Sequence, residues 1–204
     1  MATKAVPLDD KVLYKPATDP VLIDVPAFDF VMVDGTGDPA TSSAFQAAIQ
    51  AVYAFSYPVV IALKRAGRDA LRVRPLEALW WADDVTVFDP VTEDRALWHW
   101  TVMLRQPDEI PEPLVEAARK SVMKKVGEGL AGRVRLERFE EGLCVQLMHI
   151  GPYSQEGPRI AAMHKFVAGQ GLHLRGHHHE IYLSDPRRSP PSKMRTILRH
   201  PVVA

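Results

Sequence analysis

The sequence has little that would place it in a membrane or an oxidising compartment. It contains one cysteine, Cys144, which cannot form a disulfide within the chain. The apolar residues on either side of Cys144 indicate a buried thiol. No apolar run approaches the roughly 20 residues of a membrane helix, and the first residues, MATKAVPLDDK, lack the apolar core of a signal peptide. We therefore expect a cytoplasmic protein without a membrane partner.

An excess of charge of either sign is also missing. The 25 basic and 25 acidic residues give a formal net charge of +0, and the basic residues form no long block. This balance offers no electrostatic reason to expect a nucleic-acid partner. A chain of 204 residues with 47% hydrophobic residues can bury a substantial core. We expect a monomer or weak dimer whose partner is a small molecule.

Hydrophobic periodicity divides the chain into two similar halves. In each half a strand, a glycine-containing turn, a helix and two further strands follow one another. The segment DGTGDP at residues 34–39 is predicted as the first turn, with the helix starting at Asp38 and Pro39 and interrupted at Pro58. The predicted strands are 27–33, 73–81, 96–105, 133–139, 143–150, 177–183 and 194–203, and the predicted helices cover about 40–66, 111–126 and 155–170.

This order predicts an α+β fold built from duplicated strand-helix-strand-strand modules related by a pseudo-two-fold axis. The sheets are expected to be antiparallel, with the helices on one face and a ligand cleft between the halves. Residues 1–20 are predicted as an irregular N-terminal arm, and residues 21–204 as a single domain. Within that domain, repeat one covers about 21–106, a linking helix about 111–126 and repeat two about 133–204. Residues 133–150 read as a hairpin, and residues 82–94 as a loop.

Glu180 is the first candidate functional residue, because it lies inside an apolar predicted strand. Strand alternation places His178, Glu180 and Tyr182 on one face and Ile181 on the other. If Ile181 faces the helices, Glu180 and Tyr182 are expected to face the cleft. A partly buried carboxylate among aromatic rings can hold a cation or act as a base or nucleophile. The alternative is a structural ion pair with an arginine such as Arg195. The segments LEALWW and HEIYL also suggest that Glu77 is the counterpart of Glu180.

Aromatic side chains are the second signal, since all four tryptophans lie between residues 80 and 100 on two adjacent predicted strands. Neighbouring residues of a strand face opposite ways, so one of Trp80 and Trp81 is expected to line a surface or cleft. Indole and phenol rings bind flat or cationic ligands by stacking and cation–π contacts. The predicted ligand-binding residues are Tyr53, Tyr57, Trp80, Trp81, Trp98, Trp100, Tyr153, His178, Glu180 and Tyr182.

Metal and cofactor chemistry are not expected. Three consecutive histidines, His177, His178 and His179, alternate between strand faces and cannot all ligate one ion. DGTGDP lacks the third glycine of a dinucleotide-binding fingerprint, so it is read as a turn. We therefore expect no metal site and no cofactor.

Four segments resemble a known family: EIYLSDP at residues 180–186, KMRTILRHP at 193–201, GPY at 151–153 and PLEALWW at 75–81. They are similar to the GyrI-like small-molecule-binding family of the SOUL/GyrI-like superfamily, whose members are related to the effector-binding domains of multidrug-sensing transcription activators. The resemblance covers roughly residues 20–203. It implies the duplicated fold with a ligand cleft between the halves and places the family's functional glutamate at Glu180. No DNA-binding helix pair is expected before the domain.

Three functions follow from the residues and the resemblance. The first is binding of flat hydrophobic or cationic aromatic molecules in a cleft lined by Glu, Trp and Tyr, for protection against xenobiotics or toxins. The second is hydrolysis of strained electrophilic rings, because some stand-alone relatives open cyclopropane-bearing DNA-alkylating natural products. Glu180, Tyr153 and Tyr182 would then be catalytic. The third is inhibition of a DNA-handling enzyme, for which a strongly acidic surface would be expected.

Overall fold

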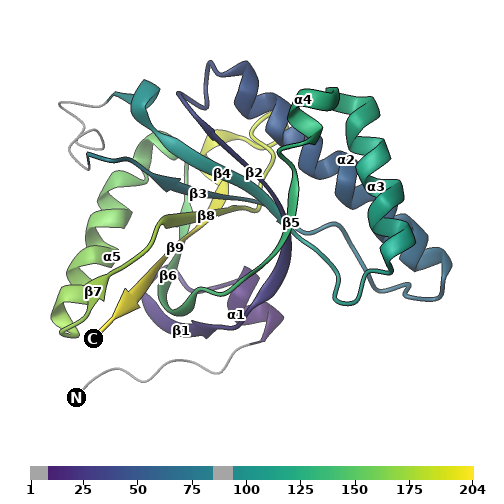
Figure 1. Cartoon of the computed structure of the whole chain (residues 1–204). Helices are drawn as coiled ribbons and strands as arrows, with labels where there is room; N and C mark the ends of the chain where they lie inside the picture. The colour runs from purple at the N-terminus through teal and green to yellow at the C-terminus, as the bar shows by residue number, and fades with distance from the viewer. Residues whose placement is uncertain (1–8, 85–93) are drawn as a thin grey trace. The chain divides into compact units, whose positions relative to one another are not determined.

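The structure is a computed structural model that describes residues 9–84 and 94–204 (Figure 1). It comprises two compact units. Unit 1 contains Met1–Ala27 and Glu140–Ala204, and unit 2 contains Phe28–Phe139. Residues 1–8 of the predicted arm and 85–93 of the predicted loop lie outside the described residues.

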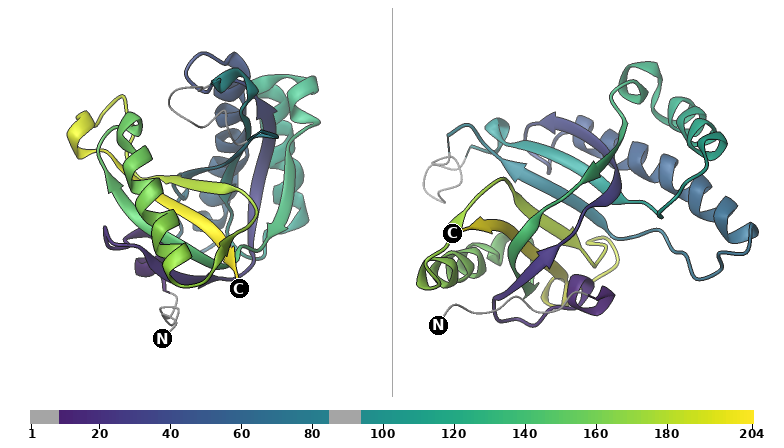
Figure 2. Two further views of the ribbon diagram at one scale, coloured as in Figure 1. Left: turned by 90° about the vertical axis from the view of Figure 1, so that its left-hand side faces the viewer. Right: turned by 60° about the horizontal axis from the view of Figure 1, so that its bottom comes forward.

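Unit 2 is an antiparallel sheet in the order β3-β4-β2-β5. Its strands are β2 (Phe28–Thr36), β3 (Leu76–Trp81), β4 (His99–Arg105) and β5 (Arg135–Phe139), and a short 3-10 helix, η2 (Arg95–Leu97), precedes β4. The helix α2 (Ser43–Arg65) packs on β2 and β4, and α3 (Glu112–Val126) packs beside α2 (Figure 2). The short helix α4 (Glu128–Ala131) follows α3.

Trp100 determines the local structure around the predicted first turn. Its ring packs edge-on against Phe45 of α2 and covers Gly35, where a Cβ atom would lie 2.1 Å from a ring carbon. Asp34, Gly35 and Thr36 therefore belong to β2 and pair with β4, instead of forming the turn predicted at residues 34–39. Only a residue without a side chain leaves room for this ring.

The helix α2 begins later than predicted and is not interrupted. Ser42 caps it by accepting a hydrogen bond from the backbone N–H of Phe45, while Asp38 accepts one from Ala40 in the preceding turn. The sequence predicted a kink or a split at Pro58; the helix runs through Pro58 to Arg65, so it is not split there. By length and composition α2 could cross a membrane. One side of α2, including Phe45, Phe55, Val59 and Leu63, is buried in unit 2, as in the core helix of a globular protein, whereas Ile61 is exposed.

The strands of unit 1 pair antiparallel in the order β1-β6-β9-β8. Its strands are β1 (Val21–Val25), β6 (Gly142–Ile150), β8 (His178–Tyr182) and β9 (Arg195–Val203), and the two-residue β7 (His173–Leu174) pairs with β9. The hairpin predicted at residues 133–150 is wrong, because β5 pairs with β2 whereas β6 pairs with β1 and β9.

Helix α5 (Gly157–Gly169) covers one face of this sheet. Met163 and Val167 of α5 pack against Val145, Leu147 and Leu198. On the opposite face Ile181, Ile197 and Met148 form a smaller cluster with Tyr14 of the short helix α1 (Asp10–Tyr14). The two remaining 3-10 helices of unit 1 are η3 (Tyr153–Gln155) and η4 (Pro191–Lys193).

A buried ionic network connects α1 to the sheet. Glu141 accepts hydrogen bonds from Arg199 at 2.7 Å, and its other oxygen lies 2.9 Å from Nδ1 of His179. Arg199 also donates to Gln146 and to the carbonyl of Leu13, and Gln146 donates to the carbonyl of Val12. Part of the arm predicted as irregular is thus a helix held by charged groups far away in the sequence.

The two units repeat one topology, and the predicted α+β fold of duplicated strand-helix-strand-strand modules is confirmed. In unit 2 the order β2-α2-β3-β4 gives the sheet β3-β4-β2, and in unit 1 the order β6-α5-β8-β9 gives the sheet β8-β9-β6. Each sheet gains one further strand, β5 beside β2 and β1 beside β6. In the sequence β1 comes before the strands of unit 2 but belongs to unit 1, and β5 comes before β6 of unit 1 but belongs to unit 2.

Candidate functional site

Tyr153 and Glu156 are positioned by the tight turn that follows β6. Gly151 has φ 141°, a conformation that side chains disfavour, and its N–H donates to the carbonyl of Met194 at 3.0 Å. Pro152 then leads into η3, which carries Tyr153, and Glu156 directly precedes α5. The predicted GPY segment is therefore a turn that presents a tyrosine and a glutamate at the start of α5.

The polar residues of strand β8 lie on the face of the strand that α5 covers. His179 and Ile181 are fully buried, whereas His178, Glu180 and Tyr182 are partly exposed, as the alternation predicted. Glu180 pairs with Leu198, which packs against α5, whereas Ile181 lies in the cluster on the opposite face. The condition that Ile181 faces the helices is thus not met for α5, since Glu180 faces this helix.

Glu77 is not the structural counterpart of Glu180. It pairs with Met103, in the cluster on the face away from α2, while Trp80 of the same strand contacts Phe45 of α2. An offset of one residue along a strand moves a side chain to the other face. The similarity between LEALWW and HEIYL therefore does not extend to the orientation of the glutamates.

The carboxylate of Glu180 is contacted by a tyrosine hydroxyl and an imidazole ring of its own strand. The hydroxyl of Tyr182 donates to Oε2 at 2.7 Å, and Nε2 of His178 lies 3.5 Å from Oε1. Its side chain is only 15% exposed. In the part of the chain that the structure describes, Glu180 has no ion pair with an arginine or lysine. Arg195, proposed above as a structural partner, is exposed. The structural ion pair is thus not formed.

Glu156 is a functional candidate that sequence reasoning missed. It is 5% exposed and forms a hydrogen-bonded carboxyl pair with Glu180. Burial, followed by the charge of Glu180, raises the pKa of Glu156 to about 9, although the nearby Thr196 hydroxyl opposes the rise. The carboxyl pair, Glu156 and Glu180, therefore retains a proton at neutral pH. A glutamate preceding a helix is usually solvated, so no local pattern indicated that Glu156 is buried.

Tyr153 and Tyr182 form an aromatic edge beside the carboxyl pair. Their ring centroids lie 5.7 Å apart at an interplanar angle of 77°, and Tyr153 is 39% exposed. Burial and the charge of Glu180 raise the pKa of the Tyr153 hydroxyl to about 12, with smaller contributions from Glu156 and Asp185. Tyr153 thus keeps its proton and offers both a hydrogen-bond donor and an accessible ring.

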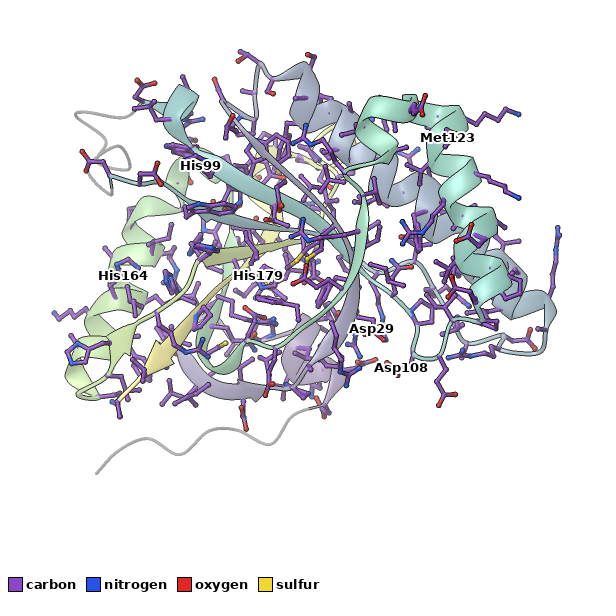
Figure 3. All side chains as sticks on the ribbon, in the orientation of Figure 1. Asp29, His99, Asp108, Met123, His164 and His179 are labelled. Atoms are coloured by element: carbon purple, nitrogen blue, oxygen red, sulfur yellow. The ribbon has the colours of Figure 1, made fainter. Side chains whose placement is uncertain are left out.

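Besides the two tyrosines, imidazole rings lie near Glu180. His200 of β9 lies 5.8 Å from His178 and 6.0 Å from His164, which projects from α5 (Figure 3), measured between ring centroids. Burial, followed by the neighbouring imidazoles, lowers the pKa of His200 to about 3. His200 is therefore neutral. Among residues 9–84 and 94–204, no group of three or more His, Cys, Asp or Glu side chains is arranged to hold a metal ion.

The other predicted ligand-binding aromatics belong to unit 2. Trp80 and Trp100 are buried against Phe45. Trp98 is partly exposed and lies edge-on to Trp80, with Arg95 over its ring. Trp81 stacks on His99, and Tyr53 stacks on Tyr57, which is 52% exposed. Unit 1 brings together the predicted residues His178, Glu180, Tyr153 and Tyr182, whereas these aromatics form their own clusters in unit 2.

An open hollow of about 320 Å³ also lies in unit 1. Its lining residues are Thr18, Met148, His149, Ile150, Gln155 and Arg159. Neither carboxyl of the pair lines it, and its walls offer no pair of groups suited to proton transfer. The carboxyl pair with its two tyrosines is therefore the better candidate site.

The fold agrees with what the chain resembles. A family model described as the GyrI-like small molecule binding domain matches residues 18–202. A crystal structure of an uncharacterized conserved protein from Listeria innocua is 43% identical, with a TM-score of 0.85, over 95% of this chain and 97% of that one. A hydrolase from Listeria innocua is 41% identical, with a TM-score of 0.78, over 95% and 96% of the two chains.

The C-terminal domain of EcmrR shares the fold, with a TM-score of 0.54 at 12% identity over 91% of this chain and 97% of that domain. No curated protein matches the chain. The chain belongs to the GyrI-like small-molecule-binding family, as the resemblance predicted.

Proposed function

We propose that the chain binds flat aromatic molecules, hydrophobic or cationic, through Glu180 with Tyr153 and Tyr182. The observation that carries this proposal is a nearly buried carboxylate whose described partners are a hydroxyl, an imidazole and the carboxyl of Glu156, without a lysine or arginine. Such a group retains most of its capacity to attract a ligand cation. The exposed ring of Tyr153 offers the adjacent stacking surface.

The remaining predicted contacts belong to the same proposal. Tyr57, Trp81 and Trp98 keep accessible ring surface in unit 2 and stay predicted ligand contacts, as does the cleft between the halves. The biological role we propose is protection against xenobiotics or toxins in the cytoplasm, by a monomer or weak dimer.

The test compares a planar aromatic cation, acridine orange, with a neutral polyaromatic of similar size, using isothermal titration calorimetry and melting temperature. We expect the wild type to bind the cation, and Glu180→Gln to weaken that binding by roughly 10–100-fold while the neutral compound changes by less than about tenfold. Glu140→Gln, at an exposed glutamate of the same unit, is the matched control. No binding by the wild type, or equal binding of the cation by Glu180→Gln, would contradict the proposal.

Hydrolysis of strained electrophilic rings is a second candidate function. Two observations favour it: Glu180 is adjacent to a second, protonated carboxyl, and two relatives at 41% and 42% identity are described as hydrolases. In this function Glu180 activates water and Tyr153 or Tyr182 donates to the oxygen that gains charge. Incubation with a cyclopropane fused to a cyclohexadienone, followed by mass spectrometry, is expected to give the water adduct. Recovery of only unmodified compound would exclude this function.

A further inference from the structure

Resting on this hydrolytic function, we infer that Glu156 is a second catalytic residue: it shares one proton with Glu180 and acts as the acid while Glu180 acts as the base. Nothing in the sequence pattern assigned a role to Glu156.

The geometry places both carboxyls where they can act on one molecule. Glu180 extends from β8 on the face covered by α5, and Glu156 directly precedes that helix. The two carboxyl groups are hydrogen-bonded to each other. One oxygen of Glu156, Oε1, is buried without a hydrogen-bond partner. A proton donor with an unused oxygen beside a partly exposed carboxylate is suited to a ligand that both accepts a proton and is attacked by water.

The surrounding charges keep the proton in the pair. The groups facing it are the Tyr153 and Tyr182 hydroxyls, the Thr196 hydroxyl and the imidazole of His178, and Asp185 adds a negative charge beside Tyr153. None of these is a permanent cation. Two carboxylates in contact without a cation repel each other, so one of them stays protonated, as burial of Glu156 also favours.

The chemistry balances without a cofactor. Glu180 accepts a proton from a water molecule as the water oxygen forms a bond to the ring carbon and the strained C–C bond breaks. The electrons of that bond move toward the conjugated carbonyl, whose oxygen takes the proton of Glu156. Water has then added across the bond, Glu180 is protonated and Glu156 is ionised. Transfer of the proton from Glu180 to Glu156 across their hydrogen bond restores the starting state.

A substrate-free experiment tests the shared proton. Infrared difference spectra between the wild type and Glu156→Gln are expected to contain the carbonyl stretch of a protonated carboxyl at pH 7.5. This band should disappear as the pH rises through about 9. The exposed-site control Glu140→Gln should leave the band in place. A wild type without a titrating acid band between about pH 6 and 10 would overturn the inference.

Kinetics with the cyclohexadienone probe test the catalytic role. Glu156→Gln is expected to lower kcat by about 10²–10⁴-fold, change KM only a few-fold and remove the alkaline limb of the pH–rate profile. Glu156→Asp, which keeps an acid, should recover part of the rate and that limb. Circular dichroism identifies variants that fail to fold, and the pH titration of the acid band in the wild type alone still tests the shared proton.

The outcomes separate the two proposals. If the wild type and Glu156→Gln hydrolyse the probe equally, with the same alkaline limb, while Glu180→Gln does not, the role of Glu156 is overturned and the hydrolase function stands. If the wild type has the acid band but leaves the probe intact, the hydrolase function is overturned, and the catalytic role of Glu156 with it.

Discussion

The hydroxyl of Tyr182 donates a 2.7 Å hydrogen bond to Oε2 of Glu180, from two positions along the same strand. Residues i and i+2 of a strand share a face but stand about 6.6 Å apart, so the two side chains must lean together. The bond fixes the orientation of the carboxylate that we propose as the ligand anchor.

Removing this hydroxyl should loosen the anchor without removing its charge. Tyr182→Phe is expected to weaken binding of acridine orange by about 3–10-fold and to lower the free energy of unfolding by about 1–2 kcal/mol, since one hydrogen bond to a charged group is lost. Calorimetric titration and urea unfolding measure both effects. The neutral polyaromatic is the internal control, and an equal loss of its affinity would show that Tyr182 contributes ring contact and not orientation.

Glu156 should make the folded chain less stable as the pH rises. Its pKa of about 9 in the folded chain lies above the ordinary value of 4.5, so the folded state keeps a proton that the unfolded chain releases. This contribution is complete below about pH 4.5 and is lost as the pH rises through 9. Glu156→Gln is therefore expected to melt about 3–6 °C above the wild type at pH 8 and close to it at pH 4.5. Scanning calorimetry across this range is the measurement, and parallel curves for the two proteins would contradict the burial argument.

Glu141 should have the opposite pH dependence. Burial alone would raise its pKa, but the charges of His179 and Arg199 hold the pKa of Glu141 at about 2. Its contribution is present above about pH 4.5 and is lost as the pH falls toward 2. Glu141→Gln leaves Arg199 buried without its counter-charge and is expected to lower the free energy of unfolding by about 3–5 kcal/mol at pH 7. Denaturant unfolding beside the neighbouring exposed variant Glu140→Gln measures this loss, and equal stability of the two variants would refute it.

Gly35 should tolerate no side chain. Gly35→Ala places a methyl group 2.1 Å from a carbon of the Trp100 ring, which is 1% exposed and packed against Phe45. We expect a loss of about 1–3 kcal/mol in unfolding free energy and an altered near-ultraviolet circular dichroism spectrum, because the indole must move. Gly37→Ala has no such neighbour and isolates the effect of its backbone conformation. An unchanged tryptophan spectrum in Gly35→Ala would contradict the packing described.

Much of the fold could be predicted from local pattern. Period-two alternation placed β8 and the faces of His178, Glu180 and Tyr182, and the 3.6-residue period placed α3 and α5. The features that local pattern did not predict depend on contacts with residues far away in the sequence. Gly35 lies in a strand because Trp100 covers it, and residues 10–14 form a helix whose Leu13 and Val12 carbonyls accept hydrogen bonds from Arg199 and Gln146 of distant strands.

The candidate site was predicted only in part, because one of its contacts also depends on residues far apart in the sequence. Glu180 and Tyr182 stood out as polar residues within one apolar strand, and Tyr153 through its GPY turn. Glu156 could not be recognised, because an acidic residue before a helix is common and only the packing of α5 on β8 and β9 makes it a buried neighbour of Glu180. The sequence pattern indicates which ionisable side chains are candidates for the site, whereas their burial in the folded chain determines which of them stay protonated.

A crystal structure of the chain with bound acridine orange tests the central claim most directly. We predict that the cationic nitrogen lies within about 4 Å of a carboxylate oxygen of Glu180 and that a ring of the ligand contacts Tyr153. A ligand bound elsewhere, with Glu180 still contacted only by its present partners, Tyr182, His178 and Glu156, would contradict the proposed site.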